Sequence, residues 1–209
     1  MGELEKGVRM TSLVFTGEGS KFGFQLGAAL KEEANGRVFS EYYGISSGAL
    51  ASFLMSQIDR SAIRKSMLSV RGRSSVFSLR WDFLWADGIF KSDPLEREIS
   101  YLLNNHRLIP ARRRDAFVNV VHFEKGVIEE RNLNKMAPVD IIQTVIQATS
   151  IPGVVSPKYY PYVDAGVLEI NPVNYAVERG SKDILIIMAR PVMSHQFERP
   201  KGLLSFALM

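Results

Sequence analysis

Residues 38–57 read VFSEYYGISSGALASFLMSQ, and this stretch decides the fold. Residues 38–43 are rich in strand-forming side chains, whereas residues 48–57 begin with small, apolar residues and favour a helix. Between them, Gly44-Ile45-Ser46-Ser47-Gly48 matches the pattern G-x-S-x-G, which belongs at a sharp turn from a strand into a helix. The stretch therefore predicts a strand, a tight turn that carries Ser46, and a helix, in that order.

The pattern places glycines on both sides of Ser46 for a steric reason. A sharp strand-to-helix turn holds its serine in a strained backbone conformation, and larger neighbours would collide. The Ser46 hydroxyl then lies at the helix N-terminus, where the dipole favours a developing negative charge. Ser47 is a competing nucleophile, but the spacing to both glycines favours Ser46 and leaves Ser47 as a small packing residue. The alternative on this pattern alone is a turn of small residues that only packs a helix on a sheet.

Strands and helices alternate along the rest of the chain. Further strands are predicted at residues 11–16, 116–124, 127–131 and 184–188. The last of these runs is almost uniformly apolar, which is typical of a central parallel strand buried on both faces. Further helices are predicted at residues 24–33, 61–70, 92–104 and 138–148. This alternation predicts the α/β class, as a three-layer α/β/α sandwich with a mostly parallel central sheet.

The helix at residues 92–104 has a clear start signal. Ser92-Asp93-Pro94 offers a capping side chain followed by a proline in the first helical turn. We therefore expect the Ser92 side chain to cap this helix.

Length and composition indicate a single globular domain. The chain has 209 residues, of which 46% are hydrophobic, and it shows no internal repeat or low-complexity linker. We expect one domain over residues 1–209, with the motifs confined to residues 11–190 and a C-terminal tail at residues 191–209. There are no cysteines, which excludes disulfides, a thiolate zinc site and a thiol nucleophile.

The net charge and the first residues of the sequence indicate which binding partners to expect. The sequence begins MGELEK, without a secretory signal or the serine or threonine that myristoylation requires, and no run approaches about 20 apolar residues. We therefore expect a cytoplasmic protein that meets a membrane only at its surface. The net charge of +4 permits attraction to anionic lipid. Nucleic acid is not expected as a partner, because no zinc-finger spacing, RNA-binding aromatic signature or long basic tract is present.

Two more segments carry residues suited to chemistry. Gly17-Glu18-Gly19-Ser20-Lys21 follows the first predicted strand, and such a loop presents backbone N–H groups to an anion. It lacks the spacing of a phosphate-binding loop, so an oxyanion hole that serves Ser46 is the better interpretation. Asp164, in Tyr162-Val163-Asp164-Ala165-Gly166, ends a predicted strand just before a turn. An aspartate there is usually turn chemistry, and its role depends on its neighbours.

Taken together, these motifs resemble the patatin-like phospholipase family. Residues 17–23, GEGSKFG, are similar to its oxyanion segment G-G-G-x-[KR]-G, and residues 44–50, GISSGAL, resemble its serine elbow. Residues 148–154, ATSIPGV, followed by residues 163–167, VDAGV, look like its A-S-x-[IA]-P-x-[VF] and D-[GA]-G block. Weaker similarities surround Gly88-Ile89-Phe90 and Asn171-Pro172-Val173. The resemblance spans residues 11–190 in the family's order.

The resemblance implies a fold and a chemistry. The fold is the α/β/α sandwich, and the chemistry is hydrolysis of acyl esters of glycerolipids by a Ser–Asp dyad, without metal or other cofactor. It assigns Ser46 as nucleophile, Asp164 as base, and backbone N–H groups around Glu18, Gly19 and Ser20 as oxyanion donors. Lys21 takes the family's basic position, where it orients the loop or is simply solvated.

The oxyanion segment departs from the family pattern at two positions. Glu18 and Phe22 stand where the family has glycines. A non-glycine residue at positive φ costs roughly 1 kcal/mol or more, and an inward Glu18 carboxylate would repel an oxyanion. These departures suggest a poorly formed hole that requires an activating protein partner or a lipid surface.

Two alternatives to the dyad stay open. His195 follows Ser46 and Asp164 in the Ser…Asp…His order of hydrolase triads, although its surroundings read as a surface loop. His106 and His122 come too early for that order and are interpreted as a helix-end residue and a strand residue. The second alternative is a patatin-like protein that binds lipid or a protein partner with little or no catalysis.

Contact with lipid is predicted at residues 80–85. Arg80, Trp81, Phe83 and Trp85 combine the arginine and aromatic side chains that are favoured at lipid headgroups. The alternative is a cap that packs these aromatic side chains over the active site. The apolar tail at residues 202–209 is either a packed helix or an interfacial anchor.

Overall fold

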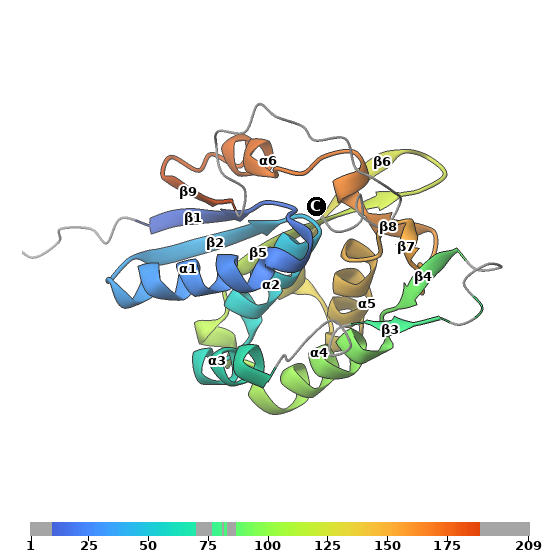
Figure 1. Cartoon of the computed structure of the whole chain (residues 1–209). Helices are drawn as coiled ribbons and strands as arrows, with labels where there is room; N and C mark the ends of the chain where they lie inside the picture. Colours follow the sequence, from blue (N-terminus) through green and yellow to red (C-terminus); the bar gives the residue numbers. More distant parts are fainter. Residues whose placement is uncertain (1–9, 70–76, 81, 83–86, 189–209) are drawn as a thin grey trace, which may run out of the picture.

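A mostly parallel sheet forms the centre of the protein. A computed structural model describes residues 10–69, 77–80, 82 and 87–188 (Figure 1). Six strands form the sheet: β1 (Met10–Phe15), β2 (Val38–Gly44), β5 (Asp115–His122), β6 (Val127–Asn132), β8 (Tyr162–Asp164) and β9 (Ile184–Ile187). Their order is β6-β5-β2-β1-β9, and β8 pairs with the last residues of β5. The pairs β1–β2, β1–β9 and β2–β5 are parallel, which confirms the predicted sheet type.

The interior position of β1 follows from its sequence. Leu13, Val14 and Phe15 are fully buried, because β2 and β9 flank the strand and helices cover both faces of the sheet. Strand β5 forms an antiparallel hairpin with β6.

The position of β9 differs from the prediction. The run at residues 184–188 forms a strand parallel to β1, but the strand ends the described sheet order and is not central. Ile186 is 38% exposed, so the strand is not buried on both faces. An apolar run indicates a parallel strand, but the order of strands is set by contacts between distant segments, which the run itself does not record.

Helices cover both faces of the sheet, as expected for the sandwich. They are α1 (Phe22–Ala34), α2 (Ser47–Gln57), α3 (Arg60–Ser69), α4 (Asp93–His106), α5 (Pro138–Ala148) and α6 (Val173–Glu178). In Figure 1, α6 lies on one face, α1, α2 and α5 lie on the other, and α3 and α4 form a further layer beyond them. Single 3-10 turns occur at η1 (Gly19–Lys21), η4 (Pro110–Arg112), η5 (Leu133–Lys135) and η6 (Ala165–Val167).

Helix α2 is buried along its whole length. All of its 11 residues are buried, because the sheet covers one side and the outer helices cover the other. This explains why its sequence is small and apolar all round, with no polar stripe. The residue that precedes this helix, Ser46, is therefore held in a rigid part of the core.

A second, smaller sheet lies beyond α4 and α5. It consists of β3 (Ser78–Leu79), β4 (Gly88–Lys91) and β7 (Gly153–Val155), in that order. A Cβ at Gly88 would lie 2.4 Å from the Ser156 backbone N, so only glycine fits beside β7. Sequence reasoning did not find this sheet, because its strands are short and lack a clear alternation.

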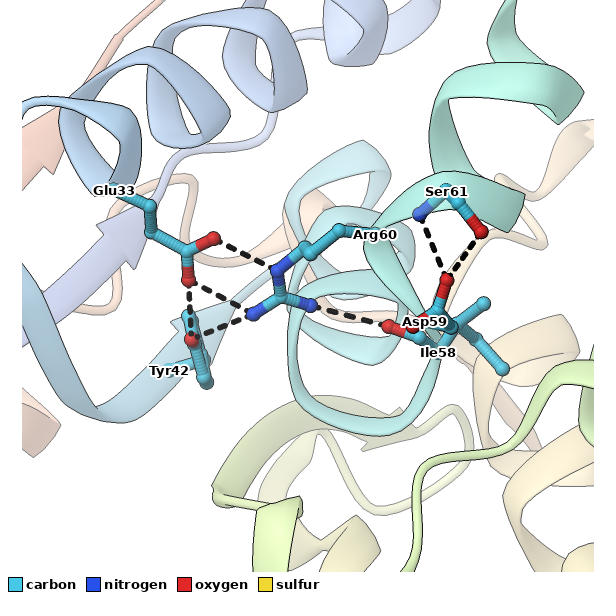
Figure 2. Close-up of polar contacts among 6 residues, drawn as sticks. All are labelled: Glu33, Tyr42, Ile58, Asp59, Arg60 and Ser61. Atoms are coloured by element: carbon cyan, nitrogen blue, oxygen red, sulfur yellow. Dashed lines mark hydrogen bonds and ion pairs between the residues drawn. The ribbon is translucent and has the colours of Figure 1, made fainter.

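A partly buried ion pair between Arg60 and Glu33 fastens the far end of α1 to α2 and α3 (Figure 2). Arg60 donates two hydrogen bonds of 2.8 Å to the Glu33 carboxylate, one to the Tyr42 hydroxyl at 3.3 Å and one to the Ile58 carbonyl at 3.1 Å. Next to it, the Asp59 carboxylate accepts the Ser61 N–H at 2.9 Å and caps the start of α3. Burial raises the pKa of the Tyr42 hydroxyl, so Tyr42 stays neutral and donates or accepts within this cluster.

The start of α4 is only partly as predicted. The helix begins at Asp93 with Pro94 in its first turn, but Ser92 makes no capping hydrogen bond. The Ser92 hydroxyl is buried without a hydrogen-bond partner among the described residues, and the Ser92 carbonyl accepts the Glu96 N–H at 2.9 Å.

Candidate active site

Ser46 lies at the turn between β2 and α2 in a strained conformation. Its φ of 56° and ψ of −125° make it the one non-glycine residue with positive φ in the described ranges. Such a conformation costs on the order of 1–3 kcal/mol and persists only where the surrounding structure enforces it. The strain therefore makes Ser46 the candidate for a chemical role.

The surrounding structure that enforces this strain is visible at Gly44 and Gly48. A Cβ at Gly44 would lie 2.1 Å from the Gly48 carbonyl oxygen, and a Cβ at Gly48 would lie 2.3 Å from the Phe15 carbonyl oxygen. Both glycines let the helix N-terminus pack directly on the ends of β1 and β2. The sequence pattern G-x-S-x-G is thus a packing requirement of this turn.

Asp164 reaches Ser46 from the other end of the chain. The last residue of β8, it is only 1% exposed. Its Oδ1 accepts the Gly166 N–H at 2.7 Å, and a Cβ at Gly166 would lie 3.5 Å from the Ser46 Cβ. The Ser46 hydroxyl is the side-chain group that donates a hydrogen bond to the Asp164 carboxylate. Because Oδ2 has no partner of regular hydrogen-bond geometry among the described residues, this contact is loose in the resting structure.

Burial changes the acidity of Asp164. It raises the pKa of the carboxyl from 3.8 to about 7, while hydrogen bonds from Ser46 and Gly166 act in the opposite direction. A carboxylate with a pKa near 7 accepts a proton far more readily than an ordinary aspartate. The pair thus combines a hydroxyl and a carboxylate suited to take its proton.

The loop after β1 presents only some of its backbone N–H groups. Gly17 N–H donates to the Ile170 carbonyl at 2.8 Å, and Glu18 N–H donates to the Ser47 hydroxyl at 2.9 Å. No hydrogen bond in the described part of the chain engages the N–H of Gly19 or Ser20. Two of the expected oxyanion donors, the N–H groups of Gly19 and Ser20, thus have no partner among the described residues, while the Glu18 N–H is held by the Ser47 hydroxyl.

Glu18 and Lys21 take different positions in this loop. Glu18 is buried, and its Oε1 accepts the Thr16 hydroxyl at 3.1 Å, which ties the carboxylate to the end of β1. Gly19 has a φ of 59°, so glycine is required at that position of the turn. Lys21 is exposed and makes no ion pair with any described residue.

The structure adds supporting residues that sequence reasoning missed. The sequence predicts Ser47 as a packing residue, yet its hydroxyl accepts the Glu18 N–H in the loop after β1. Gln25, fully buried on α1, donates to the Thr16 carbonyl at 2.9 Å and to the Ile187 carbonyl at 3.1 Å, which anchors the loop end of β1 to β9. The Ser150 carbonyl accepts the Asp164 N–H at 3.1 Å. A buried glutamine in an apolar helix face was the available signal for Gln25.

The predicted lipid-contact segment is described only in part. Arg80 follows β3, and its guanidinium binds the Asp82 carboxylate and the Ser156 hydroxyl. Trp81, Phe83 and Trp85 lie outside the described residues.

Neither the described histidines nor a group of metal-binding side chains forms part of the site among the described residues. His106 ends α4, and His122 packs edge-on against Tyr162, as a helix-end residue and a strand residue. His195 lies outside the described residues. Within the ranges that the structure describes, no group of three or more His, Cys, Asp or Glu side chains is placed to hold a metal ion. Across the same ranges, every helix is too short or too polar to span a bilayer.

Comparisons with known proteins agree with the fold described above. The model of the patatin-like phospholipase family matches residues 13–177, a range that includes both Ser46 and Asp164. The crystal structure of VipD from Legionella pneumophila is similar, with a TM-score of 0.50 and 14% sequence identity over 77% of this chain and 46% of the VipD chain. The chain thus spans less than half of that structure, and the likeness concerns the fold. No curated protein sequence matches the chain.

Proposed function

We propose that this chain, which belongs to the patatin-like phospholipase family, is a phospholipase A-type esterase that cleaves acyl esters of glycerolipids. Ser46 is the nucleophile and Asp164 is the base. The observation that carries the proposal is the meeting of a strained serine and a buried carboxylate from distant segments, β2–α2 and β8. Other hydroxyl–carboxylate contacts occur among the described residues, such as Ser66–Glu98, but Ser46 alone among the described non-glycine residues has a positive φ.

In the first step, Ser46 Oγ attacks the ester carbonyl carbon and its proton passes to Asp164. The negative charge that develops on the carbonyl oxygen is stabilised by the N–H groups of Gly19 and Ser20 and by the N-terminus of α2. The tetrahedral intermediate collapses, and the lysolipid leaves as an alcohol with the proton that Asp164 returns. The acyl group stays on Ser46 as an ester.

In the second step, water replaces the alcohol. Asp164 takes a proton from the water, which attacks the acyl carbonyl carbon, and the fatty acid leaves as Ser46 recovers its proton. Both steps use only side chains and backbone N–H groups, so the proposed route requires no metal and no other cofactor.

The direct test is turnover of a phospholipid. Replacing Ser46 by alanine removes the nucleophile, and Ser46→Ala is expected to lower fatty acid release from phosphatidylcholine vesicles by about 10⁴-fold or more. Ser56→Ala is the matched control, because Ser56 is also buried on α2 but bonds only the Phe53 carbonyl. Unchanged fatty acid release by folded Ser46→Ala protein would exclude the proposed mechanism.

The pH dependence of the reaction follows from the Asp164 pKa. Asp164 must be ionised to accept a proton, and its raised pKa of about 7 places this requirement near neutrality. We expect kcat/KM for a soluble ester to increase about tenfold per pH unit below pH 7 and to level off above it. A profile that stays flat down to pH 5 would contradict the role of Asp164 as a base of raised pKa.

A second candidate function is a patatin-like module that binds lipid or a protein partner with little turnover. The observation in its favour is the Glu18 N–H, which the Ser47 hydroxyl occupies. An activating protein partner or a lipid surface would convert this state into an active one by drawing the Ser47 hydroxyl away. The two candidates differ in phospholipid turnover and in the effect of removing that hydroxyl.

Ser47→Ala tests this contact. The variant frees the Glu18 N–H for the oxyanion, and one such donor contributes about 10²–10³ to turnover when fully engaged. Because the contact that it replaces is worth only about 1 kcal/mol, we expect kcat to rise roughly two- to tenfold. A lower kcat in Ser47→Ala, measured beside Ser56→Ala, would show that the Ser47 hydroxyl supports catalysis instead.

We also infer where the protein meets the lipid surface. Four large apolar side chains around the site are exposed: Phe24 (63%), Val167 (48%), Leu168 (57%) and Ile170 (48%). Val167, Leu168 and Ile170 lie close to the reacting groups, because residues 165–167 follow Asp164 directly and the Ile170 carbonyl accepts the Gly17 N–H. Phe24 lies in the first turn of α1, which follows the loop of residues 17–21. Ser46 itself is only 8% exposed, so a bilayer lipid must be drawn into the protein at this rim.

Vesicle binding tests the rim. Leu168→Ser combined with Ile170→Ser is expected to lower co-sedimentation with phosphatidylglycerol vesicles at least severalfold, since each buried apolar side chain contributes roughly 1.5–3 kcal/mol. Val139→Ser is the control, because Val139 is also 57% exposed but lies at the opposite end of α5 from Asp164. Equal loss of binding in the control, or none in the double variant, would exclude this surface.

A further inference from the structure

Four arginines gather where α4 ends and β5 begins. Arg107 is the first residue after α4, Arg113 is the first residue after η4, and Arg112 and Arg114 lie on either side of Arg113. Within the part of the chain that the structure describes, none of the four forms an ion pair with a carboxylate. Residues 107–114 therefore carry a concentration of positive charge that no described acidic side chain pairs with.

The carboxylates on the adjoining segments are engaged elsewhere. Asp59 lies next to the end of α4, because its N–H donates to the His106 carbonyl at 3.0 Å, but its carboxylate accepts the N–H and the hydroxyl of Ser61. Asp115, at the start of β5, accepts the side-chain amide of Asn134 at 3.1 Å. Each carboxylate thus has its own partner, and neither is within ion-pair distance of an arginine of this cluster.

Arg107 and Arg113 are the central pair of the cluster. Both side chains are half-buried, and the Nε of each is shielded from solvent without a hydrogen-bond partner among the described residues. Burial lowers the pKa of the Arg107 guanidinium, and the charge of Arg113 lowers it further. Two like charges that are partly removed from water destabilise a fold unless an opposite charge joins them.

Backbone hydrogen bonds hold this pair in place. The Leu108 N–H donates to the Gln57 carbonyl at 2.7 Å, and the Arg113 N–H donates to the Pro110 carbonyl at 3.2 Å. The Arg107 guanidinium reaches the Gln57 side-chain oxygen at 3.4 Å. The C-terminus of α2, at Gln57, attracts a cation through the helix dipole, which accounts for Arg107 but leaves Arg113 without an explanation.

We propose that Arg107 and Arg113 form a binding site for the phosphate group of a soluble ligand. A phosphate group carries about two negative charges at neutral pH, whereas a carboxylate carries one, so phosphate offsets both guanidinium groups. Its oxygens accept paired hydrogen bonds from the planar fork of an arginine. The neighbouring Arg112 and Arg114 add to the local positive potential that attracts such an anion.

The site lies far from the rim that we infer to contact lipid. Ser46 precedes α2 and Gln57 ends it, and the 11 residues of this helix rise about 16 Å. A bilayer surface at the rim around Ser46 therefore does not reach the arginines at the other end of α2. This separation favours a soluble phosphate ligand over a lipid headgroup, and the inference does not depend on the proposed esterase function.

Calorimetric titration with inorganic phosphate at pH 8 tests the site. Arg107→Gln and Arg113→Gln are each expected to weaken binding about tenfold or more, because each removes charge-assisted hydrogen bonds to the anion. Arg64→Gln is the matched control: Arg64 is exposed on α3, and its replacement removes the same charge. Absence of phosphate binding by the unaltered protein, or equal weakening in all three variants, would overturn the proposal.

Thermal denaturation gives a second measurement. Without phosphate, Arg113→Gln is expected to have a higher Tm than the unaltered protein, because it removes the like charge near Arg107. Added phosphate is expected to raise the Tm of the unaltered protein and of Arg64→Gln, but not that of Arg113→Gln. An equal phosphate-induced rise in folded Arg113→Gln would contradict the site.

Two comparisons separate the possible sources of the phosphate and the two proposals. Co-sedimentation with phosphatidic acid vesicles that Arg113→Gln abolishes, without any binding of inorganic phosphate, would overturn the soluble ligand in favour of a lipid headgroup. Ser46→Ala is expected to bind inorganic phosphate as tightly as the unaltered protein, because Ser46 lies at the other end of α2. Failure of the esterase function and failure of the phosphate site are therefore distinguishable.

Discussion

Replacing Asp164 by asparagine is expected to reduce ester turnover by about 10⁴-fold, the loss seen when a serine hydrolase loses its carboxylate. Asparagine has nearly the same shape and its amide oxygen still accepts the Gly166 N–H, so the turn after β8 is retained. What the variant lacks is the ability to accept the Ser46 proton at any pH. The measurement is kcat/KM for a soluble ester, with circular dichroism to show that the fold is intact.

The same substitution is expected to stabilise the protein above neutral pH. The folded-state pKa of Asp164, about 7, lies above the unfolded value near 3.8, so folding favours the protonated form. This stability is fully present below the unfolded pKa and is lost as the pH rises from about 4 to 7. Asparagine carries no charge, so the variant escapes a loss on the order of 4 kcal/mol.

Thermal denaturation at several pH values tests this second effect. The difference in Tm between Asp164→Asn and the unaltered protein should grow between pH 4 and 7 and then stay constant. Parallel Tm values across this range, or a variant that is less stable at pH 8, would show that the carboxylate is not buried in the way the structure describes. A group that limits stability while it is required for turnover is typical of a catalytic site.

Gly48→Ala is expected to have the largest effect on folding. Its Cβ would lie 2.3 Å from the carbonyl oxygen and 2.8 Å from the carbonyl carbon of Phe15, both in the backbone of the interior strand β1. Neither atom can move without disturbing the sheet, so we expect a loss of about 3 kcal/mol or more in the free energy of unfolding. Urea denaturation measures it.

Gly27→Ala is the matched control for this prediction. Gly27 lies in the exposed interior of α1, and a Cβ there would meet nothing within 4 Å. Alanine is the better helix former, so this variant should be more stable by roughly 0.5–1 kcal/mol. Equal urea midpoints for Gly48→Ala and the unaltered protein would contradict the tight packing of the serine turn.

Much of the fold is predictable because its signals are local. The apolar run at residues 11–16, the G-x-S-x-G turn and the proline at the start of α4 each report on their own element, and each element forms there. The order of motifs also brings Ser46 and Asp164 into one hypothesis before any contact is known. That hypothesis rests on resemblance, since nothing in the residues alone requires the two segments to meet.

The remaining features depend on contacts between distant segments. The position of β9 at the end of the described strand order and the second, smaller sheet arise from how elements pack, and a single sequence records only their separate preferences. The same holds for Ser47 and Glu18, whose hydrogen bond joins positions 29 residues apart. The pKa of Asp164 likewise follows from burial by surrounding elements, which its turn-forming neighbours do not reveal.

Labelling by a fluorophosphonate tests the central claim most directly, because the probe reacts far faster with a serine hydroxyl that a neighbouring base activates than with an ordinary serine. We expect one phosphonyl group per chain, located at Ser46 by mass spectrometry, with a labelling rate that rises with pH up to about 7 and falls strongly in Asp164→Asn. A folded protein that takes up no label at Ser46, or that reacts at the same rate with asparagine at position 164, would contradict the Ser–Asp dyad.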